Sequence, residues 1–234
     1  MRESVESALG QTVGELEVIV VDDGSEVPIA DALAGLDDPR LRIVRRRRGS
    51  SAGRARNTAL ALARAPLVSQ LDSDDAWEPG YLEAVLPCFD DPGVGLAYTN
   101  ASIVGHPDGL DTYIPDASVH PMDRFPKIAE QNPVPSPTAT MRRSAVSAVG
   151  GYAASLRYVE DYHLYLKLAR AGWRFAYVDR RLARYRWPQP ERGMSYEGRR
   201  ARRYETLMWL RFVLRHPLTP GPRRQVRTRL ARRP

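Results

Sequence analysis

The stretch Leu67-Val68-Ser69-Gln70-Leu71-Asp72-Ser73-Asp74-Asp75 joins a short apolar run to three carboxylates. The apolar run predicts a strand, so a strand is expected to end in a cluster of negative charge. Two unit charges about 4 Å apart repel each other by about 4 kcal/mol at an effective dielectric constant of about 20. Carboxylates gathered in this way need a cation or contact with water, and their hard oxygen atoms suit magnesium or manganese. We expect a divalent-cation site here, and the alternative is a solvated acidic turn that caps the next helix.

The same feature occurs upstream of this stretch. Residues 16–21 form a β-branched run typical of a strand buried on both faces, and Asp22-Asp23-Gly24-Ser25 follows it directly. Strand-like and helix-like segments alternate along this part of the chain, which predicts an α/β fold with a parallel sheet and right-handed crossovers. Ligands bind such sheets at the carboxyl ends of the strands. Both acidic clusters are therefore expected at a binding site.

Hydrophobic periodicity and turn residues predict the remaining elements. We expect helices over residues 1–8, 29–36, 53–65, 79–89, 143–149 and 160–171, and strands over residues 41–44, 95–100, 138–141 and 173–178. Residues 101–137 show no sustained period, which is typical of a binding loop or a lid.

The composition predicts a soluble globular protein of one domain, or of one domain with an appendage. The chain has 234 residues and a net charge of +7, and arginines recur from Arg180 to the end. No apolar run approaches the roughly 20 residues of a membrane span. The single cysteine, Cys88, excludes an intrachain disulfide and a cysteine-rich metal site, and it fits a reducing cytosol.

The C-terminal segment mixes apolar residues with arginine. Residues 204–215 carry both kinds of side chain, and prolines break the pattern over residues 217–222. One interpretation is a helix that packs on the rest of the chain. The other is an interfacial helix whose basic flanks lie on anionic lipid. The charge of the tail also permits nucleic acid or phosphate-bearing substrates, so the composition by itself selects no partner.

Six short motifs along the chain carry a resemblance to a known family. They are Gln11-Thr12, residues 17–25, Ala55-Arg56-Asn57, residues 71–75, Gly150-Gly151-Tyr152 and Glu160-Asp161. In this order and spacing they resemble the family 2 glycosyltransferases of the GT-A fold, over roughly residues 1–186. The resemblance implies a GT-A domain over residues 1–190, with a mostly parallel sheet flanked by helices. It leaves residues 191–234 as an Arg-rich C-terminal helical extension.

The resemblance also implies an activity and a set of donor-binding residues. Family members transfer a sugar from a nucleotide-diphosphate-sugar donor, usually with inversion, and here the acceptor is expected to be a polysaccharide or a glycolipid. Carried over to this sequence, Asp23 contacts the nucleotide base and Arg56 lies near the base or the diphosphate. Asp72 and Asp74 form the DxD element, with Asp72 toward the ribose and Asp74 as the direct ligand of Mg²⁺ or Mn²⁺.

The family likeness assigns the catalytic roles to the last motif. Asp161 is the expected general base, and Glu160 supports it. Inverting transfer independently requires a carboxylate that accepts the acceptor's proton and a cation that stabilises the departing nucleoside diphosphate. The alternatives are structural: Glu160 and Asp161 as first-turn acids favoured by a helix dipole, and Arg56 as a solvated helix residue. Asp22 is expected to be a turn or capping residue rather than a ligand.

The sequence departs from the family at two places. Members normally begin with a buried strand that forms one wall of the nucleotide pocket, and no such strand precedes residue 1, so Met1 is interpreted as an internal residue or the start of a truncated relic. Neighbouring strands would then lack a partner, and each unsatisfied buried group costs about 1 to 3 kcal/mol, so low stability and weak activity are expected. Many relatives also have a histidine after the pair equivalent to Tyr185-Arg186, which is absent here and leaves Arg186 as a weak contact for the diphosphate.

Two other functions remain as alternatives. The first is a non-catalytic relic that binds a nucleotide sugar, and the second is an Arg-rich protein that binds nucleic acid. No nucleic-acid partner is expected, because the basic residues lack a recognition motif and the acidic strand ends would repel phosphate without a cation. The expected location is the cytoplasm, with peripheral contact at the inner face of the cell membrane through the C-terminal segment.

Overall fold

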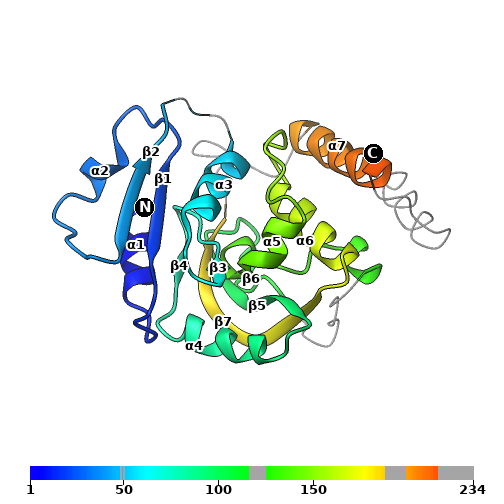
Figure 1. The fold of residues 1–234 in the computed structure, drawn as a ribbon, viewed down its shortest axis with the longest axis horizontal. Coiled ribbons are helices and arrows are strands. Elements are labelled where there is room, and N and C mark those ends of the chain that lie inside the picture. The colour runs from blue at the N-terminus through cyan, green and yellow to red at the C-terminus, as the bar shows by residue number, and fades with distance from the viewer. Residues whose placement is uncertain (48, 50, 116–124, 188–198, 216–234) are drawn as a thin grey trace.

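The computed structural model describes residues 1–47, 49, 51–115, 125–187 and 199–215. Its strands form two sheets, one of two strands in the order β1-β2 and one of five in the order β3-β6-β5-β7-β4. Helices pack around both sheets, with the two-stranded sheet at one end of the molecule and α7 at the other (Figure 1). The α/β class predicted from the sequence is confirmed.

The N-terminal part is built on the smaller sheet. It contains α1 (Arg2–Leu9), β1 (Val18–Asp22), α2 (Ile29–Ala32) and β2 (Leu41–Arg45). The strands β1 and β2 are parallel, as expected for strands joined through a helix. A small core of Val5, Leu9, Val20 and Leu33 joins α1 to this sheet. The predicted helix over residues 29–36 is only one turn long, and β1 is half-buried at most positions rather than buried on both faces.

The larger sheet carries the rest of the fold. Its strands are β3 (Leu67–Ser69), β4 (Ala76–Trp77), β5 (Val94–Val104), β6 (Thr140–Arg142) and β7 (Arg174–Arg186). The helices beside it are α3 (Ala52–Leu62), α4 (Tyr81–Val85), α5 (Arg143–Ala148) and α6 (Glu160–Arg170), with 3₁₀ turns at Leu86–Asp90, Lys127–Ala129 and Ser136–Thr138. The main core lies between β5, β6, α5, α6 and α7, and it contains Leu96, Met141 and Leu164.

The direction of the strands corrects the prediction of a mostly parallel sheet. In the larger sheet, β5 and β7 are parallel, whereas the pairs β3-β6, β5-β6 and β4-β7 are antiparallel. A parallel pair needs a crossover that returns the chain to the starting edge. The helices α5 and α6 provide it before β7, whereas β6 runs antiparallel to both of its neighbours, β3 and β5.

Two element lengths also differ from the prediction. The last strand, β7, continues to Arg186, well beyond residue 178, because β5 extends to Val104 and pairs with it through several register shifts. The predicted helix over residues 79–89 is divided into α4 and a 3₁₀ turn that contains Pro87.

The helix α7 (Arg199–Arg215) packs on the main core, which confirms the first interpretation of the C-terminal segment. Met208, Trp209 and Phe212 are buried there, and Trp209 contacts the ring of Tyr162 on α6 edge to face. Its other face leaves Leu207, Leu210 and Leu214 exposed. Within the described part of the chain, no helix has the length and apolarity needed to cross a bilayer. The predicted proline break after residue 216 lies outside the described residues.

The division into two sheets falls between β1 and β3. Among the described strands, β1 pairs with β2 alone and β3 pairs with β6 alone. The predicted boundary between residues 190 and 191 lies outside the described residues.

Candidate active site

The acidic cluster at the end of β1 contains one buried and one half-buried carboxylate. Asp22 is 1% exposed and accepts hydrogen bonds from the backbone N–H groups of Ser25 and Ile29. These bonds, the first of them above all, hold the pKa of Asp22 below its ordinary value. The prediction that Asp22 is a turn or capping residue is confirmed. The neighbouring Asp23 is half-buried and forms a 2.6 Å ion pair with Arg46, one residue beyond β2.

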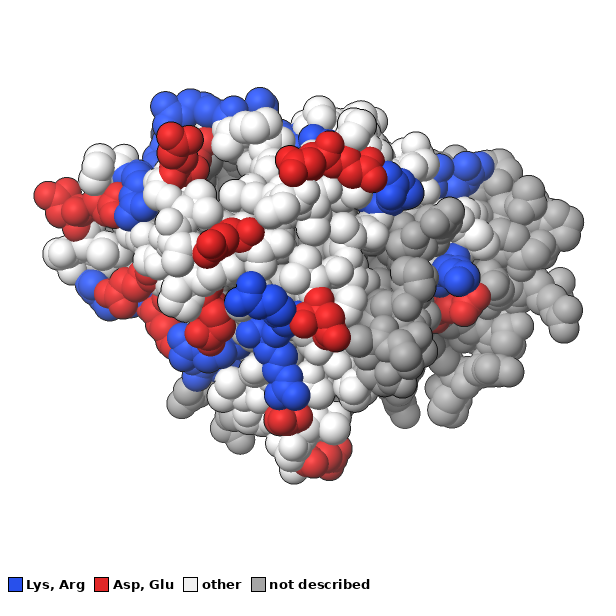
Figure 2. All heavy atoms as spheres, turned by 90° about the horizontal axis from the view of Figure 1, so that it is seen from below, with Lys and Arg blue, Asp and Glu red and all other residues white. Residues whose placement is uncertain are grey.

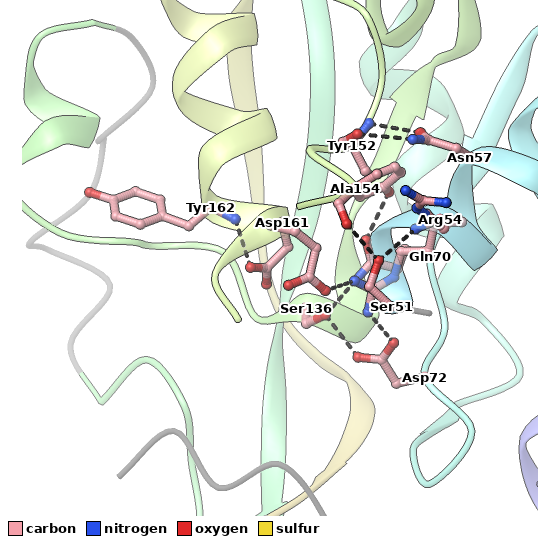
Figure 3. A network of polar contacts seen from close by, with 12 residues as sticks. Ser51, Arg54, Asn57, Gln70, Asp72, Ser136, Tyr152, Ala154, Asp161 and Tyr162 are labelled. Atoms are coloured by element: carbon pink, nitrogen blue, oxygen red, sulfur yellow. Dashed lines mark hydrogen bonds and ion pairs between the residues drawn. The ribbon is translucent and has the colours of Figure 1, made fainter. Parts of the chain in front are cut away.

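The carboxylate of Asp72, after β3, is half-buried, and both of its oxygen atoms have protein partners. Oδ1 is ion-paired with Arg56, and Oδ2 accepts a 2.9 Å hydrogen bond from Ser136. The backbone oxygen of Asp72 accepts a hydrogen bond from Ser4 of α1. Asp72 is therefore fixed in place, and its oxygen atoms are directed toward protein partners (Figure 3).

The other two acids of this loop have opposite environments. Asp75 is 3% exposed, and burial raises its pKa to about 8. It accepts a 2.7 Å hydrogen bond from the backbone N–H of Arg186, whose Nε donates to the backbone oxygen of Asp74. The Asp74 side chain is exposed. Arg186 thus anchors this loop to the end of β7. Its weak candidacy for a diphosphate contact stays a prediction.

Arg56 lies between the end of β3 and the start of α6. One of its terminal nitrogens is ion-paired with Asp72 and the other with Glu160. Its guanidinium carbon is 5.6 Å from the centroid of the Tyr152 ring, within the range of a cation–π contact. Arg56 is therefore not a solvated helix residue, and three of the predicted site residues are brought together by direct contacts.

Glu160 and Asp161 begin α6 directly after a strained residue. Val159 has φ of 55°, a left-handed conformation that costs a β-branched residue roughly 1 to 3 kcal/mol. Burial raises the pKa of Glu160 to about 7, while the charge of Arg56 lowers it. Burial also raises the pKa of Asp161, with Arg56 again the largest opposing influence. Carboxyl groups with raised pKa values beside a cation are typical of proton-transfer sites, although structural ion pairs can produce them as well.

The Ala55-Arg56-Asn57 and Gly150-Gly151-Tyr152 motifs are partners. The Asn57 side chain donates to the backbone oxygen of Tyr152 and accepts from its N–H, at 2.9 and 2.8 Å (Figure 3). Gly151 has φ of +63°, and a Cβ atom there would lie 2.6 Å from Oδ1 of Asn57. Glycine is therefore required both for the turn and for the close approach of Asn57.

A second chain of hydrogen bonds leads from Tyr152 to the carboxylate of Asp72. The Tyr152 hydroxyl donates to Oε1 of Gln70 at 2.8 Å, and Nε2 of Gln70 donates to Ser136, which in turn donates to Asp72 (Figure 3). Sequence reasoning assigned no role to Gln70 or Ser136. The position of Gln70 just before the acidic cluster was a usable signal, whereas Ser136 belongs to a segment without periodicity and offered none.

The Gln11-Thr12 motif has a structural role. The Gln11 side chain is 7% exposed, donates to the backbone oxygen of Glu78 and accepts from the N–H of Leu82. Thr12 donates from its backbone to the oxygen of Pro79. The motif therefore fastens the end of α1 to the segment that follows β4, and it keeps Ser4 of α1 beside the acidic loop.

The acidic loop fits a cation whose ligands come partly from a substrate. In the described part of the chain, no group of three or more histidine, cysteine, aspartate or glutamate side chains is placed to hold a metal ion. The exposed Asp74 offers hard oxygen atoms, while Asp72 is held by Arg56 and Ser136. Magnesium commonly binds through one or two carboxylates together with phosphate oxygens and water. The donor set therefore suits a site completed by a phosphate-bearing ligand.

Comparison with known families decides what kind of protein carries this arrangement. The family described as Glycosyl transferase family 2 matches residues 1–150. The chain belongs to this family. The resemblance noted in the sequence is thus confirmed, and the match includes four of its six motifs in full and both acidic strand ends.

Curated relatives of this family 2 chain are longer proteins. The pre-mycofactocin glycosyltransferase of Mycobacterium tuberculosis is 33% identical over 170 residues, which cover 69% of this chain and 36% of the relative. The chondroitin synthase of Escherichia coli is 31% identical over 174 residues, covering 72% of this chain and 24% of that enzyme. The chain therefore spans about a third or less of the length of these two relatives.

Solved structures show the same fold at low sequence identity. S. aureus TarS 1-349 in complex with UDP-GlcNAc has a TM-score of 0.71 and 19% identity, covering 98% of this chain and 67% of that one. The mannosyltransferase PcManGT from Pyrobaculum calidifontis, in complex with GDP-Man and Mn²⁺, has a TM-score of 0.67 and 21% identity, covering 96% and 63%. The predicted GT-A fold of the family 2 chain is therefore confirmed.

Proposed function

We propose that this chain transfers a sugar from a nucleotide-diphosphate-sugar donor to a polysaccharide or glycolipid acceptor, with inversion at the anomeric carbon and with the help of a divalent cation. The observation that carries the proposal is the ion-paired group of Arg56, Asp72 and Glu160, next to Asp161. In a family 2 chain, the acidic end of β3 is expected to face the donor, and the carboxylates at the start of α6 are expected to face the acceptor. This ion-paired group connects the two.

The donor half of the proposed site comprises the ends of β1 and β3. Asp23 contacts the nucleotide base, Asp72 lies toward the ribose, and Arg56 belongs to this half through its ion pair with Asp72. The position of both clusters at the carboxyl ends of strands supports these roles. The complexes of TarS with UDP-GlcNAc and of PcManGT with GDP-Man support the class of donor.

Asp74 is the proposed protein ligand of the cation, Mg²⁺ or Mn²⁺. When bound, such an ion stabilises negative charge on the departing nucleoside diphosphate. The exposed side chain of Asp74 supports this assignment, as does the Mn²⁺ in the PcManGT complex. The hydrogen bond from Arg186 to the backbone oxygen of Asp74 holds the loop without using its carboxylate.

Asp161 is the proposed general base. Inverting transfer needs a carboxylate that removes the proton of the acceptor hydroxyl while the oxygen attacks the sugar from the face opposite the leaving group. Asp161 accepts a hydrogen bond from the N–H of Tyr162, which fixes its carboxylate at the first turn of α6 (Figure 3). Glu160 is held by Arg56 and supports the base by keeping this turn in place.

The acceptor and the location follow from the relatives and from α7. A polysaccharide acceptor is supported by the chondroitin synthase match. Peripheral contact with the cytoplasmic face of a membrane, where lipid-linked acceptors occur, is supported by the exposed Leu207, Leu210 and Leu214 beside arginines of the C-terminal segment. A chain that ends at Gly198 should then no longer sediment with anionic liposomes, and unchanged sedimentation would exclude this contact.

The competing functions are separated by binding and turnover. The face of the molecule in Figure 2 carries acidic and basic side chains next to one another rather than a continuous basic surface, which disfavours nucleic-acid binding there. A non-catalytic relic would bind a nucleotide sugar without consuming it. A nucleic-acid binder would instead show DNA affinity that falls steeply with salt.

The test is a screen of nucleotide sugars by thermal shift, followed by transfer or donor hydrolysis, each with and without Mn²⁺. We expect one class of donor to raise the melting temperature when Mn²⁺ is present, and the same donor to be turned over. Binding without turnover under all conditions would support the relic, and no response to any donor would contradict the proposal.

A further inference from the structure

Arg56 connects two parts of the chain that are far apart in sequence. Its partners Asp72 and Glu160 lie 16 and 104 positions away, one in the loop after β3 and the other at the start of α6. The side chain of Arg56 is 18% exposed and that of Glu160 is 7% exposed. With the Tyr152 ring against its guanidinium carbon, Arg56 is held by the protein itself.

The shape of the guanidinium suits this connection. Its planar fork presents several N–H donors in fixed directions, so two carboxylates can be bound by separate nitrogens at once. A lysine ammonium carries the same charge but acts as a compact point on a flexible stem. Charge and bridging geometry can therefore be separated by substitution at this one position.

Arg56 is also the cation in a group of acids and phenols. The groups that influence Asp161 are Glu160 on the same helix, Arg56 on α3 and Asp72 after β3. Tyr152, Tyr165 and Tyr185 face the same charges, from the turn before α6, from α6 itself and from β7. The charge of Arg56 lowers the pKa of Glu160 and of Asp161, whereas burial and the charge of Asp72 raise both.

We propose that Arg56 is a positioning residue that ties the donor-side carboxylate Asp72 to Glu160 at the start of α6, and so holds its own positive charge beside the neighbouring base Asp161. The inference rests on the proposed function and extends it. It assigns Arg56 a role toward the base that is separate from contact with the nucleotide.

The test compares Arg56→Gln and Arg56→Lys with wild type, using the dependence of kcat on pH and the KM for the donor. A neighbouring arginine lowers the pKa of a carboxyl group by about 1 to 3 units, so Arg56→Gln should move the acidic limb of the kcat profile upward by about that amount. Activity lost at neutral pH should partly return at high pH. Arg56→Lys should keep the limb near its wild-type position but with a lower kcat, because lysine does not bridge both carboxylates.

Arg54→Gln is the matched control. Arg54 is exposed on the same helix, two residues away, so this variant removes the same charge without changing the ion-paired group. The acidic limb of its kcat profile should not move. If Arg56→Gln fails to fold, Arg56→Gln with Glu160→Gln replaces it, because the buried charge of Glu160 is removed together with its partner. The acidic limb of the kcat profile of this double variant should still shift, because Asp161 keeps its carboxylate and has lost the neighbouring charge of Arg56.

Two results would overturn the inference. A kcat that falls equally at every pH in Arg56→Gln would indicate a purely structural role. A higher donor KM with an unmoved limb and an unchanged kcat would indicate contact with the diphosphate instead. Both require an active wild-type protein, so they differ from a failure of the proposed function, in which wild type transfers no sugar from any donor.

Discussion

The two acidic strand ends have similar sequences and use their carboxylates differently. After β1, the buried Asp22 closes a turn by accepting two backbone N–H groups, and Asp23 remains half-buried beside Arg46. After β3, the buried Asp75 accepts one backbone N–H, Asp72 is held by Arg56 and Ser136, and Asp74 is exposed. In each cluster, one acid is buried in the fold, and the others keep part of their side chains exposed.

This comparison shows that not every acid in such a cluster is available as a ligand, because some are used by the fold. Backbone hydrogen bonds lower the pKa of Asp22, so it folds as a carboxylate, whereas burial with fewer donors raises the pKa of Asp75 to about 8. The difference follows from the stronger desolvation of Asp75, from the number of N–H groups that each carboxyl group receives, and from the neighbouring charges of Asp72 and Asp74. The acids that keep part of their surface exposed, Asp23, Asp72 and Asp74, are those that the proposed function assigns to the donor and to the cation.

The largest expected effect separates Asp74 from Asp75. Because a bound cation supplies several kcal/mol of charge stabilisation, Asp74→Asn should lower kcat/KM by about 100-fold or more and raise the Mn²⁺ concentration needed for half-maximal activity. Asp75→Asn should keep that Mn²⁺ requirement within about threefold of wild type, since an amide oxygen can still accept from Arg186. Titration of activity with Mn²⁺ measures both variants.

The opposite order of effects in these two variants would contradict the roles assigned to Asp74 and Asp75. If Asp75→Asn altered the Mn²⁺ requirement more than Asp74→Asn, the buried acid would be the ligand and the exposed one a surface residue. Circular dichroism of both variants serves as the control for folding.

A smaller effect, on stability, is expected for the acid that closes the first turn. Asp22→Asn replaces one accepting oxygen by an NH₂ group, and the lost charge-assisted bond should cost about 2 kcal/mol of unfolding free energy at pH 7. The folded-state pKa of Asp22 is lowered, so the stability it contributes is present above the unfolded value of about 4 and is lost as the pH falls through the folded value. Urea denaturation at pH 7 and below pH 4 should show the gap between variant and wild type closing at acid pH. A gap that widened there would contradict the assignment.

The smallest expected effect, also on stability, concerns the ion pair between Asp23 and Arg46. Arg46 and Asp23 are 23% and 25% exposed, and pairs of this kind contribute less than about 1 kcal/mol. Arg46→Gln should therefore change the urea midpoint much less than Asp22→Asn, although both residues lie beside the turn that follows β1. A cost similar to that of Asp22→Asn would show that this pair, rather than the capping carboxylate, holds the first strand end.

Local patterns predicted the elements and the broad placement of the acids. The β-branched run before Asp22 and the periodicity after Glu160 follow from interactions within a few residues, and both gave elements close to those observed. The mixed direction of the larger sheet depends on which distant strands pair with one another, which no local pattern specifies. The bridge formed by Arg56 depends in the same way on residues 16 and 104 positions away.

The most direct test of the account is to measure kcat and donor affinity of the Asp161→Asn protein beside wild type, with Mn²⁺ present. General-base catalysis is worth about 10² to 10⁴ in rate, so we expect kcat to fall by that factor while the Kd for the donor stays within about threefold. The isosteric amide keeps the first turn of α6 but cannot accept the acceptor's proton. A folded Asp161→Asn protein with the wild-type kcat would contradict the assignment of the base and with it the proposed mechanism.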